Sequence, residues 1–299
     1  MVSQRQSAIL MGVPTESEPT AHWALLLSCP DQSGIVHAVT GALAALGGNI
    51  TESQQYGDPV SGQFFMRVEA VGPAEHHIMA EALAPVTRRF NMTWQLDLVG
   101  RPMRCLVLVS KAPHCLVDLL YRAANQRLPV DIRAVVSNHP DLAAVAQFYS
   151  VPFHHLAVSP STKDQAEAAL EELIDQLDIE LVVLARYMQI LSPELCQKLA
   201  GRAINIHHSF LPSFKGAKPY AQAHARGVKL IGATAHYVTA DLDEGPIIEQ
   251  DVERVSHAAS VEDLVALGED AERRALAKAV GWHAEHRIAL NGHRTVVFN

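Results

Sequence analysis

The chain has 299 residues, of which 48% are hydrophobic and 19% are charged, and its formal net charge is −8. This length leaves room for two domains, and the composition is that of an ordinary soluble protein with ample core. The negative charge, without any long basic run, argues against nucleic acid as a partner, because phosphate neutralisation needs clustered Lys and Arg.

The four cysteines are scattered and form no Cys-x-x-Cys pair (Cys29, Cys105, Cys115 and Cys196). This spacing indicates reduced, mostly buried thiols rather than a disulfide or zinc framework. No run approaches the roughly 20 apolar residues of a membrane-spanning helix, and the first residues contain no signal-peptide pattern. We therefore predict a cytoplasmic protein without a membrane partner, whose residues 1–20 form a flexible N-terminal tail.

Residues 21–100 show the pattern of a small domain. Ile35, Val39 and Leu43 recur at helical spacing, and the glycines that follow Leu46 end that helix. The order of the elements, βαββαβ, predicts a ferredoxin-like fold. The predicted strands cover 21–29, 50–56, 63–71 and 92–99, and the predicted helices cover 35–46 and 74–88.

Two short motifs in this domain resemble those of ACT domains. One is Asp31-x-x-Gly34 before the first helix, and the other is Gly-Asn49-Ile after it. The resemblance implies a regulatory module that binds a small effector, often an amino acid, with Asp31, Gly34 and Asn49 as candidate effector-binding residues. Such domains commonly pair edge to edge, which implies a homodimer or homotetramer. A plain dimerisation unit without an effector is the alternative.

Residues 103–299 alternate strand and helix patterns. This alternation predicts an α/β domain with a Rossmann-like, mostly parallel sheet and helices on both faces. Ligands of such sheets bind at the carboxyl ends of the strands. The predicted strands cover 103–110, 130–137, 152–157, 180–185, 202–207 and 229–238.

The stretch from Ala203 to Gly216 (AINIHHSFLPSFKG) carries the clearest chemical signal. Its apolar residues predict the end of a buried strand, and the two-residue spacing places Asn205 and His207 on the same side of that strand. An amide beside an imidazole suits the polarisation of a carbonyl and the stabilisation of an oxyanion. Pro212 and Gly216 then bracket a loop that ends the strand.

This stretch closely resembles the signature of folate-dependent formyl transfer enzymes, in which an Asn-x-His pair precedes a Leu-Pro-Ser-aromatic-Lys/Arg-Gly loop. A second motif of that family, an Asp before a Gly-Pro-Ile strand, is present as Asp243-Glu-Gly-Pro-Ile247. The resemblance implies a formyltransferase fold with Asn205, His207 and Asp243 as catalytic residues. Asn205 and a protonated His207 would stabilise the oxyanion, and Asp243 would position and deprotonate the nucleophile.

Over about residues 20–290 the chain resembles one branch of this family, the formyltetrahydrofolate deformylases. The motifs that carry this resemblance are SNHPD at 137–141, ARYMQIL at 185–191 and the doubled histidine at 207–208. It implies hydrolysis of the linear amide in 10-formyltetrahydrofolate to formate and tetrahydrofolate, in one-carbon and purine metabolism. The implied substrate-binding residues line a pterin pocket: Met188, Gln189, Ile190, Leu191, Thr239 and Leu242.

The loop Ser110-Lys-Ala-Pro-His-Cys-Leu116 favours water as the acceptor. In the glycinamide ribonucleotide branch a glycine-rich loop at this place holds the acceptor's phosphate through backbone N–H groups. Here the loop has no glycine, and Pro113 lacks an N–H. Two alternatives stay open: transfer of the formyl group to an amine acceptor, and a folate or amino-acid sensor without turnover.

No metal and no tightly held cofactor is expected, since folate is the substrate. The 16 histidines include adjacent pairs, but neighbours on a strand point to opposite faces and so form no bidentate site. Cys115 is interpreted as a structural thiol and His236 as a packed residue of an apolar strand. Lys215 and Lys218 are candidates for attracting the glutamate tail of folate, although surface lysines more often only face solvent.

Overall fold

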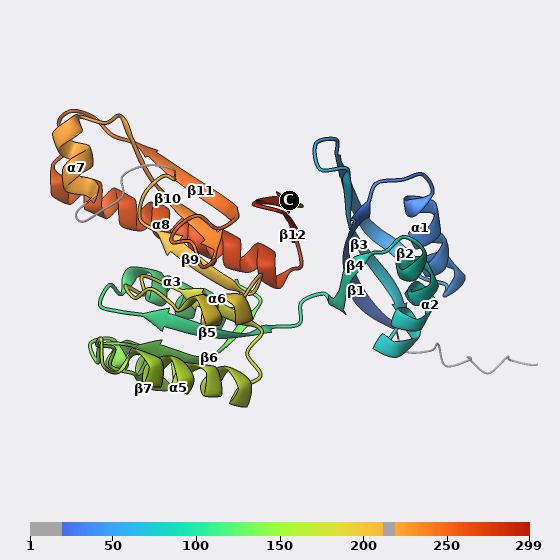
Figure 1. Ribbon diagram of the computed structural model, residues 1–299, viewed down its shortest axis with the longest axis horizontal. Coiled ribbons are helices and arrows are strands. Elements are labelled where there is room, and N and C mark those ends of the chain that lie inside the picture. Colours follow the sequence, from blue (N-terminus) through green and yellow to red (C-terminus); the bar gives the residue numbers. More distant parts are fainter. Residues whose placement is uncertain (1–19, 212–218) are drawn as a thin grey trace, which may run out of the picture.

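The computed structural model describes residues 20–211 and 219–299, which form two α/β domains lying side by side (Figure 1). The predicted tail therefore lies outside the described residues, apart from Thr20. The elements of the first domain match the predicted order: β1 (Thr20–Pro30), α1 (Ile35–Ala45), β2 (Asn49–Asp58), β3 (Gln63–Pro73), α2 (His76–Arg89) and β4 (Thr93–Leu98).

The first domain is a four-stranded antiparallel sheet in the order β2-β3-β1-β4, which confirms the ferredoxin-like fold. Alternate residues of β1 point to opposite faces. Trp23, Leu25 and Leu27 pack with Val39 of α1 and Leu83 of α2 in one apolar core. The two helices therefore cover one face of the sheet.

The second domain begins after a short connection. Its elements are β5 (Met103–Val109), α3 (His114–Ala124), β6 (Val130–Ser137), α4 (Ala143–Phe148), β7 (Phe153–His155), α5 (Lys163–Gln176), β8 (Leu181–Leu184), α6 (Pro193–Lys198), β9 (Ala203–His207), α7 (Pro219–Arg226), β10 (Leu230–Tyr237), β11 (Ile247–Arg254), α8 (Val261–Ala284), β12 (Ile288–Asn291) and β13 (Arg294–Val297).

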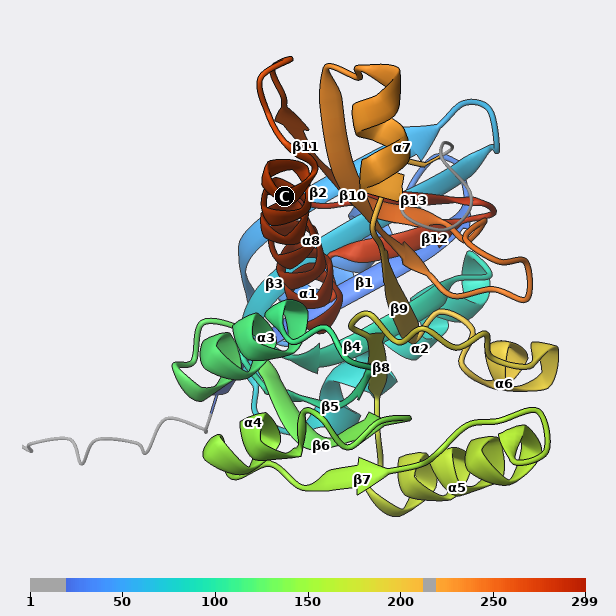
Figure 2. The ribbon, with the colours of Figure 1, turned by 90° about the vertical axis from the view of Figure 1, so that its left-hand side faces the viewer.

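Seven of these strands form one sheet in the order β11-β10-β9-β8-β5-β6-β7. The strands from β9 to β7 pair in parallel, and β10 runs antiparallel between β9 and β11. Along β5, Val107 packs with α3 and α8, whereas Leu106 and Leu108 pack with α5 and α6. Helices thus cover both faces, and Figure 2 shows α8 running along β10 and β11. The predicted mostly parallel sheet is confirmed.

The chain reverses its direction of travel across the sheet at β5. From β5 it proceeds through β6 to β7, and it then returns to β8 on the other side of β5. Such a switch point leaves a crevice at the carboxyl ends of the two central strands, where open α/β sheets bind ligands. The segments that follow β5, β8 and β9 therefore frame the expected site.

The C-terminal hairpin β12–β13 lies between the two domains and contacts β11 of the second sheet as well as β1 of the first. Phe298 and Ala289 form a small buried cluster with Phe65 of β3, on the sheet face that the two helices leave open. The buried guanidinium of Arg67 donates to the backbone oxygens of Glu285 and His286 beyond α8. Residues 288–297, predicted as part of the catalytic domain, thus join the two domains (Figure 1).

Within residues 20–211 and 219–299, no helix combines the length and the apolar character that crossing a membrane requires. All four cysteines are buried and unpaired. This agrees with the predicted free thiols.

Candidate active site

Asn205 and His207 lie at the carboxyl end of β9, as their spacing predicts. Ala203, Ile204 and Ile206 between and before them are buried and anchor the strand in the sheet. In the antiparallel pairing with β10, Asn205 lies directly opposite His236. This register brings a second imidazole to the two polar side chains.

Asp243 reaches these groups from the loop between β10 and β11. Its Oδ2 lies 3.1 Å from His207 Nδ1, and its Oδ1 lies 3.5 Å from both Asn205 Nδ2 and His236 Nε2. The three predicted catalytic residues therefore meet, although Asp243 is 36 positions from His207 in the sequence. His236 is the fourth member of the group.

The loop that carries Asp243 can approach β10 only because of a glycine. A Cβ on Gly245 would lie 1.7 Å from the backbone oxygen of Tyr237. Asp243 itself has a φ of 57°, in the left-handed region that residues other than glycine rarely adopt. A strained residue of this kind persists only where its surroundings fix it. The close loop packing and the carboxylate contacts supply that constraint.

Asp243 is ionised in this setting. Partial burial would raise its pKa, but the hydrogen bond from His207 outweighs that effect, so the pKa lies well below its usual range. Because His207 Nδ1 faces the carboxylate, its Nε2 is the free side of the ring. Among the described residues this buried Nε2 has no hydrogen-bond partner, so it remains open to a bound ligand.

His236 is 2% exposed, as expected for a packed residue, but its ring also contacts the catalytic amide. Its Nδ1 lies 2.9 Å from the backbone oxygen of Tyr237, which can only accept. In the neutral ring Nδ1 therefore carries the proton, and Nε2 accepts from Asn205 Nδ2 at 3.2 Å. Sequence reasoning missed this role; the available signal was one polar residue in an otherwise apolar strand.

A cavity of about 250 Å³ opens beside the catalytic group. All six predicted substrate-binding residues line it, in two segments, 188–191 after β8 and 239–242 after β10. The backbone N–H of Met188 donates to Ser110 Oγ at 3.0 Å, and Ser110 in turn donates to Asn138 at 2.6 Å. The first segment is therefore tied to the ends of β5 and β6.

Three large apolar side chains of these segments face solvent. Met188, Ile190 and Leu242 are 57–60% exposed. Large apolar residues exposed together beside a cavity are typical of a ligand site rather than of an ordinary surface. The predicted residues are thus well placed to contact an apolar, flat ligand.

The expectation that His207 and His208 point to opposite faces is wrong. Their rings stack with centroids 5.0 Å apart, and both residues line the cavity. The strand alternation does not extend to His208, because β9 ends at His207. Burial, together with the nearby positive charge of Arg186, lowers the pKa of His208 to about 4, so its ring is neutral at neutral pH.

Behind the cavity, Glu272 of α8 is a buried carboxylate, 1% exposed, that contacts the loop after β5. Its Oε2 lies 2.8 Å from His114 Nε2, and Tyr220 OH donates to Oε1 at 3.0 Å. Burial would raise the pKa of Glu272, but the His114 hydrogen bond and the charge of Arg186 lower it. The carboxylate therefore stays ionised.

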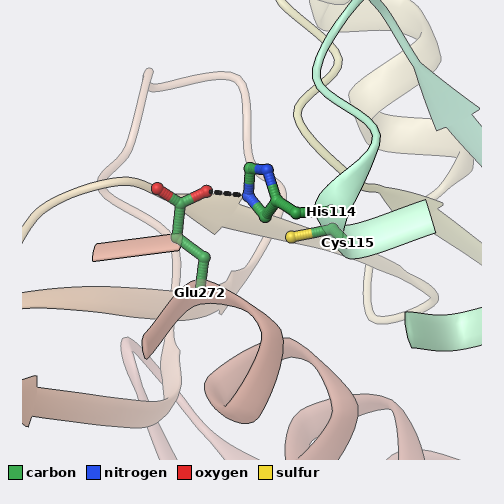
Figure 3. Close-up of side chains that lie close together, drawn as sticks. All are labelled: His114, Cys115 and Glu272. Atoms are coloured by element: carbon green, nitrogen blue, oxygen red, sulfur yellow. Dashed lines mark hydrogen bonds and ion pairs between the residues drawn. The ribbon is translucent and has the colours of Figure 1, made fainter. Parts of the chain in front are cut away.

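Glu272, His114 and Cys115 form the one group in the described chain with metal-ligand spacing (Figure 3). Their candidate ligand atoms lie within 4.8 Å of one another. However, Arg186 Nε lies 3.4 Å from Glu272 Oε2 and places a positive charge beside the carboxylate. Burial also raises the pKa of the Cys115 thiol well above its usual value. A protonated thiol beside a guanidinium does not suit a cation.

The predicted effector residues do not meet within one chain. Asp31 and Gly34 precede α1, where Gly34 has a φ of 93°. Asn49 begins β2, beyond the other end of that helix. Since a helix rises about 1.5 Å per residue, the 11 residues of α1 separate them. Lys215 and Lys218, the candidates for the glutamate tail, lie outside the described residues, as does the loop from Pro212 to Gly216.

Comparisons with known proteins agree with this geometry. Residues 103–280 match the sequence model of the formyl transferase family, and residues 23–83 match that of the ACT domain. A formyltetrahydrofolate deformylase of Corynebacterium sp. (strain P-1) is 51% identical over 94% of this chain and 99% of its own length. The chain belongs to the formyltetrahydrofolate deformylase family.

Solved structures place the family in a wider fold group. A formyltetrahydrofolate deformylase from Burkholderia mallei superposes with a TM-score of 0.90 at 49% identity, covering 93% of this chain and all of that one. Glycinamide ribonucleotide transformylase 1 from Symbiobacterium toebii superposes with a TM-score of 0.63 at 31% identity, covering 69% of this chain and 98% of that one. The deformylase family thus shares its fold with a formyl-transferring enzyme.

Proposed function

We propose that this protein hydrolyses 10-formyltetrahydrofolate to formate and tetrahydrofolate. The observation that carries the proposal is the grouping of Asn205, His207 and Asp243 beside a cavity with an apolar rim. Asn205 and His207 provide hydrogen-bond donors for an oxyanion, and Asp243 provides a carboxylate that can accept and return a proton. Membership in a family whose relatives are formyltetrahydrofolate deformylases supports the same reaction.

The cavity suits the pterin head of the folate. At about 250 Å³ it is close to the lower limit of about 300 Å³ for ligand pockets, so it matches the head of the ligand rather than the whole molecule. The segment 188–191 offers backbone groups for the edge of the ring, and Leu242 offers apolar surface. The rest of the folate would follow the exposed apolar rim.

The formyl oxygen is held by two donors. Asn205 Nδ2 supplies one N–H while His236 fixes the orientation of the amide. His207 Nε2, the side of the ring that faces away from Asp243, supplies the other when the ring is protonated. Each such donor is typically worth about 3 kcal/mol of transition-state stabilisation.

Asp243 takes part in the proton transfers of the reaction. Water attacks the formyl carbon, and its proton passes to the Asp243–His207 pair. The carbon–nitrogen bond breaks as the folate nitrogen takes up a proton, giving tetrahydrofolate and formate with one proton released overall. Because the pKa of Asp243 is low, the carboxylate holds this proton only in transit and otherwise orients the His207 ring.

The first turn of α3 supports water over a phosphorylated amine as the acceptor. Its N-cap is Pro113, which has no N–H to offer, and the next residue, His114, is bonded to the Glu272 carboxylate. An anion is therefore already present beside the turn that would have to receive a phosphate. Electrostatic repulsion and the missing donor both disfavour a second anion there.

The test is to incubate the purified chain with 10-formyltetrahydrofolate and no acceptor, and to follow formate and tetrahydrofolate. We expect formate release that collapses in Asp243→Ala and persists in Asp164→Asn, a control on the exposed surface of α5. Formyl transfer that starts only after an amine is added would make the protein a transferase. Tight folate binding without formate release would make it a sensor.

The first domain is proposed to regulate this activity by binding a small effector, with an amino acid as the chemical class. The match to the ACT domain supports this role. Titration of the full chain with individual amino acids, followed by calorimetry and by the hydrolysis rate, tests it. An effector that binds but leaves the rate unchanged would contradict regulation, and no binding at all would favour a plain dimerisation unit.

We also propose a cytoplasmic homodimer or homotetramer. In the described four-stranded sheet, β2 and β4 are edge strands with backbone groups available for pairing with a second copy. Four unpaired, buried thiols suit a reducing compartment. Light scattering of the full chain across a concentration series tests the oligomer, and a monomer throughout would contradict it.

A further inference from the structure

Arg186 stands out because its backbone is strained and its side chain is incompletely paired. It follows β8 with a φ of 64°, in the left-handed region. Conformations of this kind are unfavourable for residues other than glycine and are concentrated at functional sites. The neighbouring segment is fixed by the hydrogen bond between Met188 and Ser110. The chain therefore maintains an unfavourable backbone conformation that aims this guanidinium at a defined place.

The guanidinium has more donors than the described residues use. Its one ion pair within residues 20–211 and 219–299 is with Glu272, and the Nε to Oε2 distance of 3.4 Å is long. Glu272 is already engaged by His114 at 2.8 Å and by Tyr220 at 3.0 Å, and Figure 3 shows the His114 bond. Nε and Nη1 of Arg186 are buried without a hydrogen-bond partner among the described residues. Buried donors normally find partners, so these two are available to a ligand.

The residue that carries these donors lies at the reaction cavity. Arg186 lines it together with His207 and His208, whose rings stack against each other. Since His208 is neutral at neutral pH, it adds no positive charge of its own. Arg186 therefore supplies a positive charge near His208, whose ring stacks on the catalytic imidazole, on a wall that the predicted pterin-binding segments share.

Hydrolysis has a requirement that formyl transfer to an amine does not have. The neutral formyl group becomes formate, a planar carboxylate that must form next to the ionised Asp243. A guanidinium fork matches a carboxylate in shape and charge, and it remains charged at every physiological pH. A positive group that is only loosely held in the resting chain can turn to this product without losing a strong bond.

We propose that Arg186 binds the formate ion as it forms, with its unpaired Nη1–H group as the donor, and so makes a formate subsite beside His207. This inference rests on the proposed hydrolysis and adds the group that receives its anionic product. Glu272 balances the charge of Arg186 while the subsite is empty, and so keeps the guanidinium from pairing with Asp243.

The test measures formate binding without turnover. The full chain is titrated with ¹³C-formate in the presence of tetrahydrofolate, and the dissociation constant is read from the formate signal. Loss of hydrogen bonds to a charged group should weaken binding about tenfold to a hundredfold in Arg186→Gln. Arg186→Lys should be intermediate. Arg122→Gln is the matched control, since Arg122 pairs with Asp118 on α3, and it should bind as the unmodified chain does.

A second measurement does not depend on whether Arg186→Gln folds. The Arg Nε–H signal that is absent from the spectrum of Arg186→Lys identifies Arg186 in the unmodified chain, and it should shift when formate is added. Formate binding that is equal in Arg186→Gln, or an Arg186 signal that stays still under saturating formate, would overturn the subsite. Non-saturable binding to the unmodified chain would also overturn it.

The two proposals fail separately. Formate release from 10-formyltetrahydrofolate without an Arg186-dependent formate site would refute the subsite and leave the hydrolase intact. Formate binding at Arg186 in a chain that releases no formate would refute the proposed function, and the subsite would then serve another carboxylate.

Discussion

Exchanging Asp243 for Asn tests the catalytic group most directly, because it keeps the shape of the side chain and removes its charge. The carboxylate is 18% exposed and lies 3.1 Å from His207 Nδ1. Without the charge, His207 loses the partner that orients its ring, and the transit site for the water proton disappears. We expect turnover to fall roughly 10²- to 10⁴-fold, the usual range for general acid–base groups. The KM should change little, because the predicted pterin-binding segments of the cavity are untouched.

The same exchange should also destabilise the chain. A hydrogen bond to a charged group contributes about 1.5–3 kcal/mol, and each kcal/mol shifts the midpoint of thermal unfolding by roughly 2–4 °C in a chain of this size. Asp243→Asn should therefore unfold several degrees below the unmodified chain at pH 7. Asp241→Asn, an exposed neighbour in the same loop, serves as the stability control.

The pH dependence of this difference follows from the direction of the pKa shift. Because the pKa of Asp243 is lowered in the folded chain, its contribution is complete above the usual Asp pKa of about 3.9 and is lost as the pH falls from there toward the folded-state pKa. The gap in unfolding free energy between the unmodified chain and Asp243→Asn should thus be constant near neutrality and shrink below about pH 4.

Two results would refute this reasoning. Turnover above a tenth of the unmodified value would show that the carboxylate is not needed for proton transfer. An unfolding midpoint at pH 7 equal to or above that of the unmodified chain would show that the Asp243 carboxylate does not stabilise the folded chain through His207. Steady-state kinetics and differential scanning calorimetry supply both numbers.

Three other exchanges probe the supports of the site. His236→Phe removes the acceptor of Asn205 and should lower kcat about tenfold or more with KM kept; an unchanged kcat in steady-state assays would deny His236 a positioning role. Gly245→Ala places a Cβ 1.7 Å from the Tyr237 oxygen, so we expect an inactive chain whose thermal midpoint, measured by calorimetry, is lower. Normal activity would contradict this expectation. Arg67→Met removes a buried, hydrogen-bonded charge between the two domains and should lower the free energy of unfolding by about 3–5 kcal/mol. Calorimetry should then show separate transitions for the two domains, and a single unchanged transition would contradict this.

The catalytic group was predictable because its signals are local. The alternation of a strand places Asn205 and His207 on one side, and the chemistry of an amide and an imidazole suggests what they do. Asp243 came from a motif in another segment, and the fold brings the two motifs together. The positions of most strands before β11 also followed from local patterns, as for β8, which is one apolar run.

The supporting residues were not predictable in the same way. His236 looks like a packed residue because it is one, and only the register of β9 against β10 shows that its ring faces Asn205. Glu272 is 86 positions from Arg186. The sequence does contain one signal for it, since Glu272 lies on the face of α8 that buries Ala271, Ala275 and Leu276. A charge on a buried face requires a partner, but the sequence does not name that partner.

The arrangement of charges explains why these distant residues matter together. A hydrolase must admit a neutral formyl group and then accommodate an anion next to a catalytic carboxylate. Asp243 is occupied by His207, and Glu272 is occupied by His114 and Tyr220. In the described part of the chain, Arg186 is therefore left with one long ion pair. Glu272 balances the charge of Arg186 while the cavity admits the neutral substrate. The carboxylate product can then form a closer ion pair with Arg186 than Glu272 does. The loose pairing of Arg186 is thus the feature that favours release of the formyl group to water.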